Sequence, residues 1–109
     1  MQQVTSDWLD KRGDLHDATV TDVRQSGSSL EIDINDEWFN ERGLTLPEDD
    51  AAPGKLVVED FTAVEGEPKD AVGGWIYEIL LADNQLTLQF CDRDPVRLRA
   101  SAVRWLSDH

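Results

Sequence analysis

The chain has 109 residues, of which 23 are acidic and 10 basic, giving a formal net charge of −13 at pH 7. This length suits one domain around one core, so we expect residues 1–109 to form a single domain. Such a negative field repels nucleic-acid phosphates and anionic lipid and favours basic protein surfaces. We therefore expect no nucleic-acid and no membrane partner, and a basic protein as the class of partner.

The cellular compartment is predicted from the start of the chain and from its cysteine content. Residues 1–7 lack the basic and apolar regions of a signal peptide, and no segment has the ~20 apolar residues of a membrane span. Cys91 is the only cysteine, which excludes an internal disulfide framework. These features together predict a cytoplasmic location.

The first predicted elements are a short helix and a hairpin. Residues 6–13 combine an N-cap candidate, early acids, later bases and a final glycine, the pattern of a two-turn helix that must dock through Trp8 and Leu9. Residues 30–34 alternate apolar and polar, and the turn at 26–28 pairs them with 19–25. The pairing needs either a bulge between Val20 and Val23 or a strand that is partly covered on both faces.

The middle of the chain is less regular. Residues 36–43 resemble a helical turn, with acids first and glycine last. Residues 47–54 contain two prolines and three acids without a bulky apolar side chain, which predicts a mobile surface loop. Residues 55–64 form one β-rich run with apolar groups on both faces, and residues 66–74 form a second loop.

The strongest local signal lies near the C-terminus. Residues 76–82 and 85–91 flank the turn pair Asp83-Asn84, and a two-residue turn aligns three apolar cross-strand pairs. These pairs are Tyr77 with Phe90, Ile79 with Leu88, and Leu81 with Leu86. The next strand, 96–100, is expected to set Leu98 opposite Leu88 and Ala100 opposite Leu86, with Arg97 and Arg99 pointing outward.

The predicted fold class is therefore α+β and mainly antiparallel. We expect a single sheet or curled half-barrel of five to six strands, with a short N-terminal helix and one helical turn.

His16 and Asp17 are the candidates for chemistry, since histidine suits proton transfer near neutral pH. Neighbouring residues on a strand point to opposite faces, so we expect this pair not to form a relay by itself. A Gly-x-Ser-x-Gly nucleophile elbow is absent. The favoured interpretation is structural, with Asp17 capping or turning the backbone at the strand entrance, and the alternative is a small hydrolase or isomerase that uses His16. We predict no catalytic residues.

Metal and cofactor sites are not predicted either. Residues 33–37 alternate oxygen ligands, but Trp38 and Leu44 stand where a calcium loop needs glycine and glutamate. One cysteine and two histidines are too few for a zinc site. Gly73-Gly74 lacks the spacing and the lysine of a phosphate-binding loop. We therefore expect no metal and no cofactor.

Tryptophan is frequent for this length, with four residues, and is enriched at binding hot spots. Trp8, Trp38, Trp75 and Trp105 are each expected first as cover for the edges of the core. The pair Trp38-Phe39 is the best candidate for a partner surface because acids surround it. The predicted partner-binding residues are Asp36, Glu37, Trp38, Phe39, Glu41, Glu48, Asp49 and Asp50.

Two segments carry a resemblance to a known group of proteins. Residues 15–20, with the sequence LHDATV, and the hairpin that follows to residues 30–34 resemble the opening of small bacterial proteins that begin with a His-Asp step into the first strand. Residues 86–90 and 96–100 are similar to the closing strands of such proteins. This group includes uncharacterised domains and immunity proteins of bacterial toxin systems. The resemblance implies a non-enzymatic binding protein and transfers no catalytic residues.

The leading hypothesis is a non-catalytic, immunity-like binding protein that engages a basic partner through an acidic and aromatic surface. The alternatives are the small His16 enzyme and a structural module that forms a homodimer through an exposed strand edge.

Overall fold

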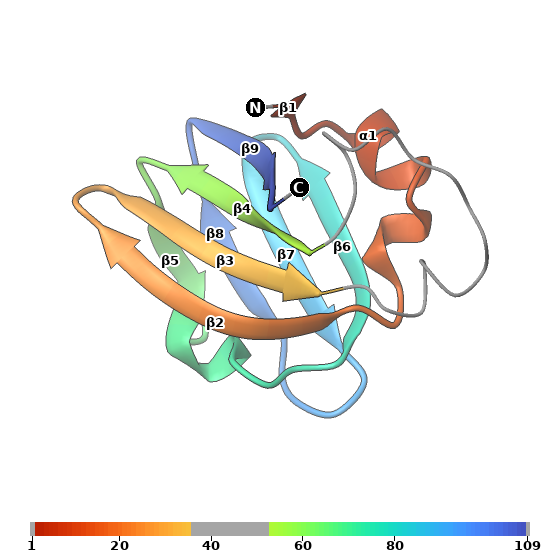
Figure 1. Ribbon diagram of the computed structural model, residues 1–109. Helices are drawn as coiled ribbons and strands as arrows, with labels where there is room; N and C mark the ends of the chain where they lie inside the picture. The colour runs from red at the N-terminus through yellow and green to blue at the C-terminus, as the bar shows by residue number, and fades with distance from the viewer. Residues whose placement is uncertain (1, 36–52, 109) are drawn as a thin grey trace.

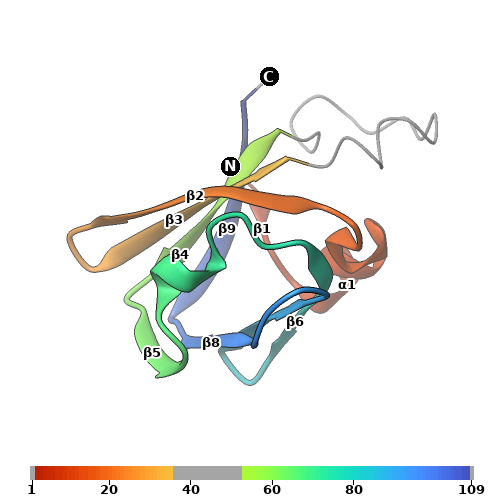
Figure 2. The ribbon, with the colours of Figure 1, turned by 90° about the horizontal axis from the view of Figure 1, so that it is seen from below.

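The computed structural model describes residues 2–35 and 53–108, which form two antiparallel sheets packed face to face (Figures 1 and 2). The front sheet of Figure 1 has the strand order β1-β9-β4-β3-β2, with β1 at Gln2–Gln3, β9 at Ala102–Ser107, β4 at Gly54–Glu59, β3 at Ser29–Asn35 and β2 at Thr19–Ser26. The rear sheet has the order β5-β8-β7-β6, with β5 at Thr62–Glu65, β8 at Val96–Arg99, β7 at Gln85–Phe90 and β6 at Ile76–Ala82. The predicted antiparallel β class is confirmed.

The core lies between the two sheets and follows the period-two alternation of the strands. In β3, Leu30, Ile32 and Ile34 are buried while the residues between them are partly exposed, and β4 shows the same pattern. The opposite layer contributes the largest apolar side chains of β6, β7 and β8, namely Ile76, Ile79, Leu86, Leu88, Val96 and Leu98. Alternation therefore gives each sheet one apolar face, and the two apolar faces bury each other.

A short helix is present near the N-terminus, but it covers five residues and not the predicted range 6–13. Helix α1 spans Ser6–Asp10, and Thr5 caps it by accepting a hydrogen bond from the Trp8 amide at 3.1 Å. Trp8 and Leu9 are buried, as the docking argument predicts. A helix this short is unstable alone, so its packing on the end of the sandwich maintains it (Figure 1).

The β2–β3 hairpin contains the predicted bulge. Val20 pairs with Ile34 and Val23 pairs with Ile32, and the register shifts by one residue between them. The extra residue brings both Val20 and Val23 to the buried face. Of the two alternatives left open by the sequence, the bulge is the correct one.

The expectation of one sheet with five to six strands is wrong, because the described residues form two sheets with nine strands. The run at 55–64 divides at Asp60, whose φ of 52° turns the chain from β4 in the front sheet to β5 in the rear sheet. The last strand, β9, was not predicted. It lies beside β4 and places Val103 and Trp105 in the core.

The β6–β7 hairpin has the predicted turn and two of the three predicted pairs. Ile79 pairs with Leu88 and Leu81 with Leu86. The third pair is wrong, because a bulge after Ile76 sets that residue opposite Phe90 and turns Tyr77 outward, where it is 52% exposed.

The register of β8 differs by two residues from the prediction. Leu98 lies opposite Leu86 and Val96 opposite Leu88, so the ladder ends at the Leu88–Val96 pair and residues 89–95 connect the paired positions. A shift by two preserves the faces, so Val96 and Leu98 remain buried and Arg97 still points outward beside Thr87.

Some predictions lie outside the described residues. The helical turn at 36–43 is among them, as is most of the loop at 47–54. Gly54, which was assigned to that loop, is the first residue of β4 and is buried. Within residues 2–35 and 53–108, no helix is long and apolar enough to cross a membrane.

Candidate functional site: the surface around His16

The site begins with an unusual turn between α1 and β2. Gly13, Asp14 and Leu15 have φ angles of 59°, 56° and 56°, and Asp17 follows at 71°. Left-handed conformations cost L-residues roughly 1–2 kcal/mol each, and Asp is among the most tolerant of them. Leu15 nevertheless adopts this conformation because its side chain is buried in the core. Strain of this kind concentrates at functional positions, which directs attention to the residues that it places.

His16 and Asp17 come together, contrary to the prediction that they point to opposite faces. His16 Nε2 lies 3.5 Å from Asp17 Oδ2. The alternation of a strand does not govern this pair, because the two residues precede β2 and the left-handed backbone of Asp17 rotates its side chain toward the imidazole. The other ring nitrogen, Nδ1, lies 2.7 Å from the carbonyl oxygen of Tyr77, so this nitrogen carries the proton and donates it.

Asp17 also holds an exposed tryptophan in place. Trp75 Nε1 donates to Asp17 Oδ1 at 2.9 Å, and the Trp75 amide donates to Asp92 Oδ1 at 3.1 Å. The Asp17 amide donates to the carbonyl of Ile76, which joins the turn to the start of β6. The φ of 71° shows that Asp17 turns the backbone at the strand entrance. Its capping role stays a prediction, because the hydrogen bond that its carboxylate accepts from Trp75 comes from an indole and not from a backbone amide.

Two aromatic rings and an imidazole form one exposed surface as a result. The His16 and Tyr77 rings meet edge to face, with centroids 5.5 Å apart. Trp75 is 49% exposed and Tyr77 is 52% exposed. Exposed aromatics held by hydrogen bonds are typical of binding surfaces, because their order is established before binding.

A shallow depression of about 430 Å³ lies beside this surface, lined by Gly13, Asp14, His16, Tyr77 and Glu78. Its two carboxylates come from different elements, the turn before β2 and strand β6. Carboxylates beside an open tyrosine ring are the groups that bind a guanidinium or an ammonium. We call this set of five residues the His16 depression.

The contacts of His16 within the described residues do not include a nucleophile. Its partners are a backbone carbonyl and a carboxylate. Burial, Asp17 and Asp92 raise the pKa of the Cys91 thiol, which disfavours the reactive thiolate. Among residues 2–35 and 53–108, no three His, Cys, Asp or Glu side chains are placed to hold a metal ion.

The predicted partner-binding residues, from Asp36 to Asp50, lie outside the described residues. The described tryptophans fall into two classes. Trp8 and Trp105 pack together in the core with ring centroids 5.5 Å apart, whereas Trp75 is exposed. The expected role as cover for the core thus fits Trp8 and Trp105.

The negative charge is concentrated in the segments that connect the strands. Within the described residues, the strands carry six acids and five bases, and the remaining segments carry eleven acids and four bases. Residues 5–17 alone hold four acids, and one of their two bases, Arg12, is buried with its guanidinium 3.8 Å from the centroid of the Trp8 ring. The end of the molecule that bears the His16 depression is therefore acidic.

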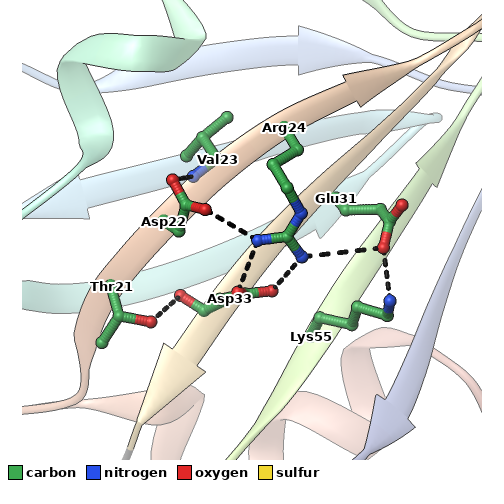
Figure 3. A network of polar contacts seen from close by, with 7 residues as sticks. All are labelled: Thr21, Asp22, Val23, Arg24, Glu31, Asp33 and Lys55. Atoms are coloured by element: carbon green, nitrogen blue, oxygen red, sulfur yellow. Dashed lines mark hydrogen bonds and ion pairs between the residues drawn. The ribbon is translucent and has the colours of Figure 1, made fainter.

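The outer face of the front sheet, in contrast, pairs its charges internally (Figure 3). Arg24 binds both carboxylate oxygens of Asp33 at 2.7 Å and also bonds Asp22 at 2.8 Å. Lys55 bonds Glu31 on the neighbouring strand.

These contacts also lower the pKa values of two acids on that face. The bond from Arg24, together with the Val23 amide, lowers the pKa of Asp22. The bond from Lys55 lowers the pKa of Glu31. A face of this kind stabilises strand register and has little charge left for a partner.

Sequence reasoning identified His16 and Asp17 but missed the other members of the site. Trp75 was expected to cover the edge of the core, like the other tryptophans. Tyr77 was paired with Phe90 on the apolar face, because strict alternation hides the bulge after Ile76. A usable signal was the position of Gly74. A Cβ atom there would lie 2.6 Å from a Phe90 ring carbon, so the chain before β6 is crowded on its inner side and the next large ring turns outward.

Comparison of the chain with models of protein families, with curated proteins and with solved structures finds no match.

Proposed function

We propose that the protein is a non-catalytic binding protein whose partner is a basic protein. The observation that carries the proposal is the His16 depression, which Asp14 and Glu78 line together with the exposed Tyr77 at the acidic end of the molecule. A lysine or arginine side chain of the partner would place its charge between the carboxylates and its stem against the ring.

The distribution of charge supports binding of a basic partner at the end of the molecule that bears the His16 depression. Acids on the strands are largely matched by bases, whereas the segment that carries α1 and the His16 turn has an excess of carboxylates. Electrostatic attraction would therefore direct a basic partner toward this end, with a rate that falls as salt rises. The sequence resemblance to immunity proteins suggests a toxin as the partner, and a cytoplasmic location would accompany that role.

The first experiment uses a defined probe. A blocked Gly-Arg-Gly peptide is titrated into the labelled protein while amide shifts are recorded, with Gly-Glu-Gly as the matched control. We expect the arginine peptide to shift the amides of residues 13–16 and 77–78 and the glutamate peptide to leave them unchanged. Equal shifts from both peptides, or none from either, would reject the depression as a cation site.

Two variants then separate the local charge of the depression from the overall charge of the protein. Glu78→Gln removes one carboxylate and retains its size, and we expect it to weaken the arginine peptide about 2- to 5-fold, as loss of an exposed ion pair does. The control is Asp83→Asn, which removes an equal charge at the β6–β7 turn. It should change peptide affinity only by the small effect of the lower overall negative charge. If both variants weaken binding equally, the contact is with overall charge and not with the depression.

The natural partner is sought by retention on the immobilised protein. A partner whose retention decreases with salt and with Tyr77→Ala would support the proposal, and a partner that is unaffected by both would contradict it.

A further inference from the structure

A second cavity lies near the β2–β3 turn, toward the end of β2 that is far from His16. It has a volume of about 310 Å³ and opens between the edge strand of each sheet, β2 in front and β5 behind. Its walls are Val23, Gln25, Leu30, Phe61, Ala63, Glu67, Pro68 and Lys69. Small-molecule sites are concave and mostly apolar, and in β-proteins they occur at the mouths of barrels, so an apolar opening between two sheets is a candidate of the same kind.

The cavity exists because the core is incomplete at this corner. Ala63 lies opposite Leu98, and Gln25 lies opposite Leu30, so both side chains belong to the inner faces of their sheets. Leu98 and Leu30 are buried, yet Ala63 and Gln25 are exposed. The small methyl group of Ala63 leaves unfilled the space that a larger side chain would occupy, and Val23 and Leu30 form an apolar floor beneath it.

The rim of the cavity carries one charge of each sign. Glu67 and Lys69 are both exposed and lie two residues apart at the short helical turn η3, which spans Pro68–Ala71 and has Glu67 as its N-cap residue. Neither forms an ion pair with another residue in the described part of the chain. The site therefore offers an apolar floor, an acceptor for a cation and a donor for an anion within one small volume.

We infer that this cavity binds a small zwitterion with an apolar body, the chemistry of a free amino acid with an aromatic or branched side chain. The ammonium group would contact Glu67, the carboxylate would contact Lys69, and the side chain would occupy the space above Val23 and Leu30. The volume is at the lower end of the range for ligand sites, which suits one amino acid better than a larger ligand. This site is independent of the proposed function, since it shares no residue with the His16 depression.

The test is a titration of the labelled protein with L-phenylalanine. We expect a dissociation constant on the order of 1 mM, which ligand efficiency gives for a molecule of about a dozen non-hydrogen atoms. Amide shifts should be concentrated at Val23, Leu30, Ala63 and Lys69. L-phenylalaninamide lacks the carboxylate and 3-phenylpropionate lacks the ammonium, and each should bind about 2- to 5-fold more weakly, as expected for one exposed ionic contact.

Two matched variants test the position of the site. Ala63→Trp fills the cavity and should abolish the shifts, whereas Thr62→Trp adds the same ring on the outer face, opposite Arg99, and should preserve them. Because Ala63 is exposed, Ala63→Trp is expected to fold. Lys69→Gln is a second variant, which removes the charge at the rim without filling the cavity. Lys69→Gln should weaken phenylalanine about 2- to 5-fold and leave phenylalaninamide unchanged.

Several outcomes would overturn the inference. Absence of shifts, shifts outside the cavity, or an unchanged response in Ala63→Trp would each show that phenylalanine does not bind there. Equal binding of the two analogues and phenylalanine would show that an apolar group alone is recognised. Self-association that Ala63→Trp abolishes and Thr62→Trp preserves would show that a second copy of the chain fills the space.

Discussion

Asp17 offers the sharpest test of how the site is built, because its backbone and its side chain make separable contributions. Its φ of 71° is unfavourable for most L-residues and well tolerated by Asp and Asn. Its carboxylate accepts the Trp75 indole hydrogen at 2.9 Å and faces His16 at 3.5 Å. Asp17→Ala removes both contributions, whereas Asp17→Asn preserves the backbone tolerance and a carbonyl acceptor.

The expected loss of stability follows from these two contributions. Placing Ala in the left-handed region costs about 1 kcal/mol. Loss of a partly exposed hydrogen bond to a carboxylate costs about 1 kcal/mol. We therefore expect Asp17→Ala to lower the free energy of unfolding by about 2 kcal/mol, with a Tm decrease of about 8 °C for a domain of this size. Asp17→Asn should cost less than about 1 kcal/mol.

Urea unfolding with detection by far-ultraviolet circular dichroism measures both values without relying on tryptophan emission. Trp75→Phe, which removes the donor and retains a ring, completes a double-mutant cycle with Asp17→Ala. The coupling energy should be about 1 kcal/mol, and Trp75→Phe should leave the backbone part of the Asp17→Ala effect intact. Equal losses in Asp17→Ala and Asp17→Asn, or additive effects in the cycle, would refute this account of the turn.

Three further predictions follow from other contacts. The lowered pKa of Glu31 means that its bond to Lys55 stabilises the fold above the unfolded pKa of about 4.5 and is lost as pH falls through the folded pKa. Lys55→Met should therefore lower the urea midpoint at pH 7 and have little effect near pH 2. Gly54→Ala should destabilise by about 1–3 kcal/mol in urea unfolding, because its Cβ would lie 2.5 Å from a Trp105 ring carbon, whereas Gly27→Ala meets no neighbour and should cost about 1 kcal/mol for its positive φ alone. The raised pKa of Cys91 should move the midpoint of its alkylation rate above that of free cysteine, and a midpoint at or below the free value would contradict the electrostatic description.

Local patterns predicted the elements more accurately than their arrangement. Alternation at Leu30, Ile32 and Ile34 identified β3, and the turn at 83–84 identified the β6–β7 hairpin, because both depend on neighbours in the sequence. The division into two sheets depends on a single positive φ at Asp60 and on pairing of β4 with β9, 48 residues apart from Gly54 to Ala102. Contacts at that separation leave no periodic signal within either segment.

In the candidate site, the residue types could be recognised from the sequence, but the directions of their side chains could not. His16 and Asp17 were recognisable as a chemical pair, but their relative direction depends on a left-handed turn that Gly13 alone does not reveal. Tyr77 was assigned to the core because one bulge reverses the face of every residue before it. Exposed aromatic residues are thus hardest to predict where irregular backbone creates them.

Asp14 combines a strained backbone with a charged side chain, and two substitutions can separate the effects of the backbone and of the charge. Its φ of 56° and ψ of 25° lie in the left-handed region, and its carboxylate lines the His16 depression. Asp14→Ala should lower the free energy of unfolding by about 1 kcal/mol, whereas Asp14→Gly, which tolerates this backbone, should change it by less than about 0.5 kcal/mol. Both variants lose the same charge, so both should weaken binding of the arginine peptide by the same factor.

Stability measured by urea unfolding should therefore follow the backbone at position 14, while affinity measured by peptide titration should follow the carboxylate. If Asp14→Gly retains wild-type affinity, the carboxylate does not contact the cation, and the strained turn serves only to bury Leu15. If affinity decreases in both variants while stability decreases in one, the strained turn holds a carboxylate at the surface where the arginine peptide binds.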